Sequence, residues 1–232
     1  MTPWSQVGSR WTTRPFGLGV LLAGLWIFGS GEALLLASTL GNSPWTVLAE
    51  GISKHSALSV GAATFAVSLA VLLLWIPLRE RPGLGTVLNA IVISVALDVM
   101  LAVFGDDHPM AVRVGMMFGG VLILALGGAL YLTCNLGPGP RDGLMTGLHH
   151  RFGWPIAAVR TGLEVSALVG GWLLGGTVGI GTAVFAFGVG PALAMFLRLV
   201  GRYAAKRHPS PDRPWTAVGD IRGTARWSRV GP

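Results

Sequence analysis

The chain has 232 residues, of which 52% are hydrophobic and only 12% are charged. Soluble globular domains carry about 25% charged residues, so this composition excludes a disordered protein and argues against an ordinary soluble enzyme. Cys134 is the single cysteine, which argues against a secreted module built on disulfides. The formal net charge of +7 raises the question of nucleic-acid binding, which the positions of the charges can answer.

Six apolar segments have the length of membrane helices, which need about 20 apolar residues to cross about 30 Å of hydrocarbon. They cover residues 16–40, 57–78, 84–104, 112–136, 154–176 and 179–200. Glycine, proline or charged residues separate the segments, and the break between the last two is short and uncharged. The sequence therefore predicts an all-α membrane protein with six transmembrane helices.

The arginines and lysines near the helix ends predict the orientation of these helices. With six crossings, both termini and every second loop share one side. That side carries Arg10, Arg14, Arg79, Arg81, Arg141 and Arg151. The opposite side carries Lys54 and Arg113 together with Asp106 and Asp107. We therefore expect both termini in the cytoplasm.

Most of the net positive charge lies between Arg198 and the C-terminus. We predict a cytoplasmic N-terminus over residues 1–15 and a basic, disordered cytoplasmic tail over residues 201–232. The tail either binds anionic lipid headgroups or serves as a topology signal. Because no aromatic platform or recognition motif accompanies the charge, we expect no nucleic-acid partner.

The sequence repeats itself at a shift of 96 residues, which aligns residues 17–104 with 113–200 without a gap. The matched positions include Gly41 and Gly137, Pro44 and Pro140, Gly83 and Gly179, and Thr86 and Thr182. Each repeat, 16–104 and 112–200, holds three crossings, and an odd number turns the second copy upside down. The sequence therefore predicts two inverted repeats, a plan that many secondary transporters share.

Each repeat also has a short segment after its first crossing, over residues 43–54 and 140–151. Gly41 and Gly137 break the preceding helix, and Pro44 and Pro140 suit the first turn of the next one. Both segments are too short to cross a membrane. They are either half-helices that point their positive N-terminal ends at a central anion site, or helices lying at the membrane surface.

Ionisable residues within a membrane are costly unless they are paired or hydrated. The six segments contain four of them: Glu32, Asp98, Arg160 and Glu164. Arg160 and Glu164 are spaced i,i+4, so they can pair on one helix face, either to fix helix packing or to form a gate or substrate site. Glu32 either meets Arg160 across the bundle or carries a coupling proton. Asp98 lies near a helix end, where it can reach the lipid headgroups.

Arg141 and Asp142 open the second short segment, as a topology charge with a capping acid or as a cytoplasmic gate or anion contact. The predicted substrate-binding or gating residues are Arg160, Glu164, Glu32, Arg141 and Asp142. The sequence lacks metal-ligand spacings, phosphate-binding loops and Ser-His-Asp constellations. We therefore expect no metal, no cofactor and no enzymatic activity.

Motifs in the second repeat resemble the YczE branch of the YitT/YczE family of bacterial membrane proteins. They are the run from Gly137 to Met145, Arg160 with Glu164, the run from Leu174 to Gly176, the run from Gly179 to Thr182, and Gly190-Pro191. The likeness covers roughly residues 14–202. It implies an integral protein of the bacterial inner membrane and brings no substrate, cofactor or catalytic residue with it.

From these features we expect a transporter-like protein for a small anionic or zwitterionic solute, with proton coupling through Glu32 as one possible form. The alternative is a non-transporting membrane protein that supports a biosynthetic or regulatory partner through its loops and tail. Transport predicts a polar cavity near Arg160.

Overall fold

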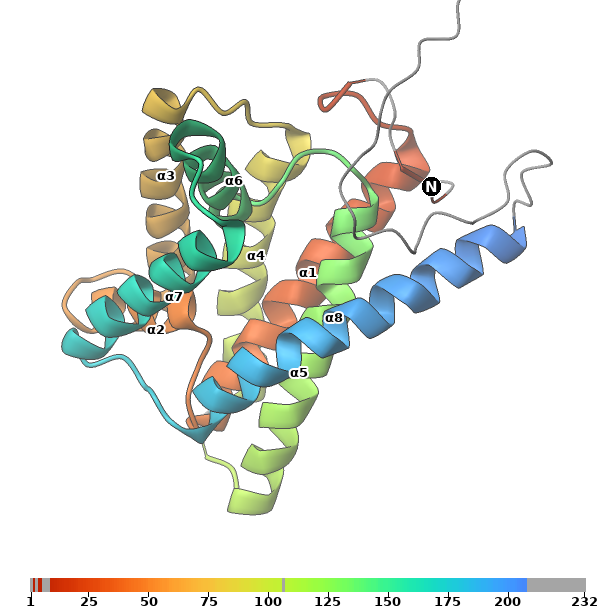
Figure 1. The fold of residues 1–232 in the computed structure, drawn as a ribbon. Helices are drawn as coiled ribbons and strands as arrows, with labels where there is room; N and C mark the ends of the chain where they lie inside the picture. The colour runs from red at the N-terminus through yellow and green to blue at the C-terminus, as the bar shows by residue number, and fades with distance from the viewer. Residues whose placement is uncertain (1, 3, 6–8, 106, 208–232) are drawn as a thin grey trace, which may run out of the picture.

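The computed structural model describes residues 2, 4–5, 9–105 and 107–207, and within this part of the chain it contains eight helices and no strand. The helices are α1 (Pro15–Ser38), α2 (Pro44–Lys54), α3 (Val60–Leu78), α4 (Leu84–Phe104), α5 (Met110–Thr133), α6 (Pro140–Phe152), α7 (Ile156–Leu173) and α8 (Ile180–Arg207), shown in Figure 1.

Six of these helices, α1, α3, α4, α5, α7 and α8, are long and apolar enough to cross a membrane. They confirm the six predicted segments, with ends that differ by a few residues. The other two, α2 and α6, have 11 and 13 residues and correspond to the predicted short segments. Helix α8 continues to Arg207, and the rest of the predicted tail lies outside the described residues.

The helices form two groups (Figure 1). In the first group, α1 packs against α4 and α5, and α5 packs against α8. In the second group, α2 packs against α3 and α7, and α6 packs against α3 and α7. Helices α3 and α4 join the groups by packing side by side, whereas α7 and α8 scarcely touch over their described residues. The two groups therefore lie close together on the α3–α4 side and apart on the α7–α8 side.

Glycines bring α1 and α5 into close contact at the centre of the first group. A Cβ atom added to Gly127 would lie 2.6 Å from the carbonyl oxygen of Gly24, and one added to Gly31 would lie 2.8 Å from the carbonyl oxygen of Gly120. Small residues allow such backbone approach between membrane helices. The two helices cross with opposite chain directions (Figure 1).

The turns before the two short helices dock on the first turns of α4 and α8. The carbonyl oxygen of Leu40, before α2, accepts a hydrogen bond from the Gly181 amide at 2.8 Å. The carbonyl oxygen of Leu136, before α6, accepts one from the Gly85 amide at 2.9 Å. The residues of one contact lie 96 positions from those of the other, which matches the spacing of the sequence repeat.

The predicted helix-breaking glycines take a backbone conformation that favours glycine. Gly41 has a φ of 120° and Gly137 a φ of 114°. A Cβ atom on Gly41 would lie 2.8 Å from the Thr182 hydroxyl, and one on Gly137 would lie 2.8 Å from the Thr86 hydroxyl. Both glycines therefore satisfy a conformational and a packing requirement at the start of a short helix.

Candidate functional site

A cavity of about 190 Å³ is lined by residues from all eight helices. Its polar lining comes mainly from α3, α6 and α7, and its apolar lining mainly from α1, α5 and α8. The charged and hydroxyl side chains on it include Thr64, Ser68, Arg141, Asp142, Arg160 and Glu164. Four of the five predicted site residues therefore share one cavity, and the fifth, Glu32, lies elsewhere.

The N-terminal ends of α2 and α6 both reach this cavity. Pro44 and Trp45 line it from α2, and Pro140 and Arg141 line it from α6. In both helices the proline occupies the first turn, where its missing N–H group costs nothing. The indole Nε1 of Trp75 donates to the carbonyl oxygen of Pro140 at 3.0 Å and holds the start of α6 against α3. The positive ends of two helix dipoles thus point toward one space.

Arg141 places a cation with unused hydrogen-bond donors in the cavity. Its guanidinium lies over the ring of Trp45, with the carbon Cζ 5.2 Å from the ring centroid. Within the described part of the chain, no protein group accepts a hydrogen bond from this guanidinium. Burial lowers the pKa of Arg141, while the nearby carboxylates of Glu32 and Asp142 act in the opposite direction. Arginine nevertheless stays charged at neutral pH, so its five N–H groups are free to bind an anion.

Asp142 is held at the edge of the same cavity by Tyr131 of α5. The tyrosine hydroxyl donates to the Asp142 carboxylate at 2.9 Å. Asp142 also lies in the first turn of α6, where the helix dipole favours a negative charge. One of its oxygen atoms is therefore engaged with the protein, which leaves Arg141 as the less satisfied of the two charges.

Arg160 and Glu164 form the predicted ion pair on α7. The Nε of Arg160 donates to the Glu164 carboxylate at 2.9 Å. The two side chains are 54% and 34% exposed, so the pair faces open space and is not a buried packing contact. Thr64 and Ser68 occupy the corresponding positions of the first repeat, and they line the same cavity.

Glu32 of α1 is buried against the start of α2, where hydroxyl groups satisfy it. Ser43 Oγ donates to its carboxylate at 2.9 Å, and Thr46 Oγ1 donates at 2.6 Å. The structure therefore gives Glu32 partners at the N-cap and in the first turn of α2, while Arg160 pairs within its own helix. The Glu32 charge still acts on Arg141, so the residue influences the cavity without lining it.

Asp98 joins the end of α4 to the start of α3. Its carboxylate accepts a hydrogen bond from Ser59 Oγ at 2.5 Å and another from the Gly61 amide at 2.7 Å. Asp98 thereby accepts a hydrogen bond from a free amide at the N-terminus of α3, next to the N-cap residue Ser59. Asp98 therefore has a structural role within the protein, and its approach to lipid headgroups stays a prediction.

Sequence reasoning missed Glu50, a buried acid on α2. Its carboxylate accepts hydrogen bonds from Lys54 Nζ at 2.7 Å, from Asn42 Nδ2 at 2.8 Å and from the amide and hydroxyl of Thr177. Burial alone would raise the pKa of Glu50, but the hydrogen bonds from Lys54 and Thr177 outweigh this effect and hold it below the ordinary value of 4.5. The i,i+4 spacing of Glu50 and Lys54 was the available signal. It lay in a short segment outside the six crossings.

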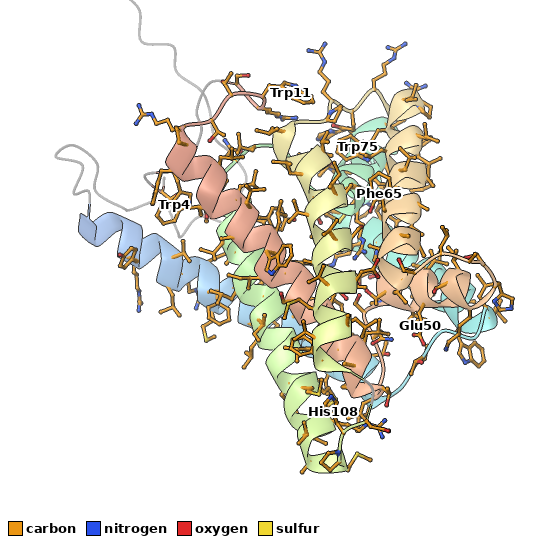
Figure 2. All side chains as sticks on the ribbon, turned by 180° about the vertical axis from the view of Figure 1, so that it is seen from behind. Trp4, Trp11, Glu50, Phe65, Trp75 and His108 are labelled. Carbon is orange, nitrogen blue, oxygen red and sulfur yellow. The ribbon has the colours of Figure 1, made fainter. Side chains whose placement is uncertain are left out.

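The Glu50 cluster fastens α2 to the connection between α7 and α8. Lys54 Nζ also donates to the carbonyl oxygen of Gly175 in that connection at 2.7 Å. Figure 2 shows Glu50 and Trp75 in separate parts of the second helix group. Each short helix is therefore fastened to the other repeat, α2 through Glu50 and α6 through Trp75.

The cavity thus presents two cations, two anions and several hydroxyl groups opposite an apolar wall. This set can bind a small anion or zwitterion by charge-assisted hydrogen bonds. Among the described residues, no group of three or more His, Cys, Asp or Glu side chains could hold a metal ion.

Comparison with known proteins reveals similarity along most of the chain. Residues 16–198 match the family of unknown function DUF6198. No solved structure matches the chain.

Three relatives cover most of this chain and most of their own lengths. An "Uncharacterized protein" of Haemophilus influenzae is 42% identical over 201 residues, which are 87% of this chain and 92% of the relative. The "Uncharacterized membrane protein YczE" of Bacillus subtilis is 30% identical over 81% of this chain and 85% of its own. The "Uncharacterized protein YyaS" of the same organism is 28% identical over 81% of this chain and 93% of its own. The similarity to YczE confirms the resemblance expected from the motifs.

Proposed function

The chain belongs to the DUF6198 family of YczE-like membrane proteins, and from the geometry of its cavity we propose that it is a transporter-like protein for a small anionic or zwitterionic solute. The solute binds in the cavity shared by the eight helices, with Arg141 as its principal anion contact. The observation that carries this proposal is the guanidinium of Arg141, which faces the cavity and donates no hydrogen bond to any protein group among the described residues.

An inverted relation between residues 16–104 and 112–200 is part of the proposal. A two-fold axis pairs every contact between the halves with a second contact. If residue i of the first half contacts residue j of the second, the counterpart of i in the second half contacts the counterpart of j in the first half. The contact of Gly24 with Gly127 has such a counterpart in that of Gly120 with Gly31. The hydrogen bond between Leu40 and Gly181 likewise has its counterpart between Leu136 and Gly85.

Such a relation makes α2 and α6 half-helices that enter from opposite faces of the membrane. Their N-terminal ends then approach one another near the middle, as in transporters that hold an anionic group between broken helices. The contact between Trp45 and Arg141 supports this arrangement, because the two residues occupy corresponding positions of the repeats.

The unequal packing of the two halves supports alternating access. Helices α3 and α4 pack together, whereas their counterparts α7 and α8 stand apart. Exchanging these two arrangements would close one side of the cavity and open the other. In this scheme Arg160 and Glu164 gate the open side, Arg141 and Asp142 form the central site, and Glu32 of α1 carries a coupling proton.

The proposed location is the bacterial inner membrane, with both termini in the cytoplasm. This orientation is supported by the arginines that follow the second and fourth crossings and by the basic C-terminal segment. Anionic lipid headgroups are the proposed partners of the basic tail.

Cysteine accessibility tests alternating access without knowledge of the solute. Cys134 is first replaced by alanine, and the cavity residue Met145 is then replaced by cysteine. A membrane-impermeant maleimide is applied to sealed vesicles of either orientation. We expect Met145→Cys to react from both sides, because the cavity opens to each side in turn.

Leu73→Cys provides the control, because Leu73 is 58% exposed on α3 and does not line the cavity. A thiol that faces hydrocarbon should not react from either side. Labelling of Met145→Cys from one side alone, or from neither, would contradict transport and favour the non-transporting alternative.

A further inference from the structure

We infer that the ligand of this cavity is an amphipathic organic anion, with one carboxylate or phosphate head on a short apolar body, which enters sideways between α7 and α8. The inference rests on the proposed function, since it names the substrate class of the same site. It follows from the distribution of polar and apolar groups, the gap between two helices, and the volume of the cavity.

The polar wall of the cavity can bind an anionic head. Arg141 supplies free donors, and the side chain of Asn89 lies beside the start of α6 and adds an amide. Asp142 and Glu164 already have protein partners in Tyr131 and Arg160. Among the described residues each of these carboxylates accepts a hydrogen bond from the protein, whereas Arg141 donates none, so an anionic group finds its donors at Arg141 and Asn89.

The opposite wall is apolar over three helices. Phe185, Val189 and Leu193 follow one another at four-residue intervals on α8, so they form a stripe on one helix face. Phe28 of α1 and Leu124 of α5 continue this surface. A fully hydrophilic ion would leave this wall in contact with water, whereas an apolar body would cover it.

In this proposal the gap between α7 and α8 is the side of the cavity that opens to the membrane. Both helices line the cavity, yet they scarcely touch each other over their described residues. The Arg160–Glu164 pair lies on this side with both side chains partly exposed. Lipid chains cannot solvate such a pair, so the gap holds either water or the polar head of an amphipathic molecule.

The cavity volume limits the size of the ligand. About 190 Å³ is below the roughly 300–1,000 Å³ typical of sites for drug-sized molecules. A single short chain fits this space. A phospholipid would place its headgroup alone in the cavity, with its two chains passing out between α7 and α8.

Binding of octanoate to the full-length protein tests the inference. The protein is placed in nanodiscs of phosphatidylcholine, and the dissociation constant is measured by calorimetry. We expect octanoate to bind at least roughly tenfold more tightly than acetate, which lacks the apolar body, or octanol, which lacks the charge. Equal affinities for the three probes, or no binding of octanoate, would overturn the inference.

Arg141→Gln should weaken octanoate binding by roughly ten- to a hundredfold, because it removes a charge-assisted contact. Arg151→Gln is the matched control, since it removes a charge from the exposed end of the same helix, and its affinity should equal that of the wild type. Leu193→Ser tests the apolar wall and should weaken octanoate while leaving acetate unchanged.

Nanodiscs of phosphatidylglycerol distinguish a free organic anion from a lipid headgroup. Octanoate affinity that is unchanged in this lipid supports the free anion. Strong competition by phosphatidylglycerol would overturn the inference in favour of a lipid ligand. If octanoate binds as expected but Met145→Cys reacts from one side alone, the ligand class stands and transport fails. If Met145→Cys reacts from both sides but octanoate does not bind, the ligand class is rejected and transport is retained.

Discussion

At the scale of single residues, charge in this protein is placed where local donors can satisfy it. Glu32, Glu50 and Asp98 are each held near the start of a helix or beside a turn by hydroxyl or amide groups. Arg141 differs, because its partner within the protein is the face of an aromatic ring. This contrast separates carboxylates that fasten helices from a cation that remains available to a ligand.

The pH dependence of stability should depend on Glu50. Because its pKa is lowered in the folded state, the unfolded state binds more protons at acidic pH. The contribution of Glu50 to the free energy of unfolding is therefore complete above the ordinary carboxyl pKa of 4.5 and is lost as the pH falls through the lowered pKa. Glu50→Gln should reduce stability at pH 7 by about 1–3 kcal/mol and flatten the decline between pH 6 and pH 3.

Thermal unfolding in detergent across this pH range measures the effect. Glu80→Gln is the control, because Glu80 is also a partly buried acid but lies after α3 and contacts His150 of α6. If the stability of Glu50→Gln falls as steeply with decreasing pH as that of the wild type, other groups control acid unfolding.

The sequence predicted the charges at this scale better than it predicted their partners. The i,i+4 spacing identified Arg160 with Glu164, because the partners lie on one helix. It could not identify Asn42 and Thr177 as partners of Glu50, because the bond to Thr177 joins two repeats across 127 residues. Contacts of this kind depend on how helices pack, which a single sequence does not encode locally.

At the scale of elements, hydropathy and turn residues were sufficient to predict the helices. Glycine and proline end helices for reasons that are local to the chain, so the predicted starts at 84 and 140 agree with those of α4 and α6. The crossing of α1 and α5 adds a requirement that hydropathy does not express. Glycines must occupy one face of each helix.

Gly127→Ala should disrupt this crossing. Its Cβ atom would lie 2.4 Å from the backbone nitrogen of Phe28, and a backbone atom cannot move aside cheaply. We expect a loss of about 1–3 kcal/mol in the free energy of unfolding, measured by denaturation in detergent.

Gly115→Ala, also on α5, is the matched control because no atom lies within 4 Å of its added Cβ. It should leave stability unchanged or raise it slightly. Equal effects of the two substitutions would show that helix propensity, and not the contact with α1, determines the result.

At the scale of the whole molecule, the repeat predicts more than the helix order. The starts of α2, α3 and α4 recur 96 residues later as those of α6, α7 and α8, at residues 140, 156 and 180. Sequence alone could not show that the two halves pack unequally, because this difference lies in the distance between helices and not in their composition.

Distances between spin labels should reveal both arrangements. One labelled pair is Val169→Cys with Phe187→Cys on α7 and α8, and the corresponding pair is Leu73→Cys with Ile91→Cys on α3 and α4. All four side chains are exposed in the structure. Measured by pulsed electron resonance in lipid, each pair should show two populations, with the longer distance favoured for α7–α8 and the shorter for α3–α4. A single distance for each pair would contradict exchange between the two arrangements.

The contact between Trp45 and Arg141 shows what two unequal halves in one polypeptide make possible. Both residues stand at the same position of their repeats, so in an assembly of two identical halves this position would meet its own copy. Two arginines there would repel each other, and two tryptophans would offer no charge to an anion. Joining the halves in one polypeptide lets the position carry an aromatic ring once and a cation once. A single polypeptide can therefore hold a stacked, singly charged centre that no symmetric pair of identical copies could build.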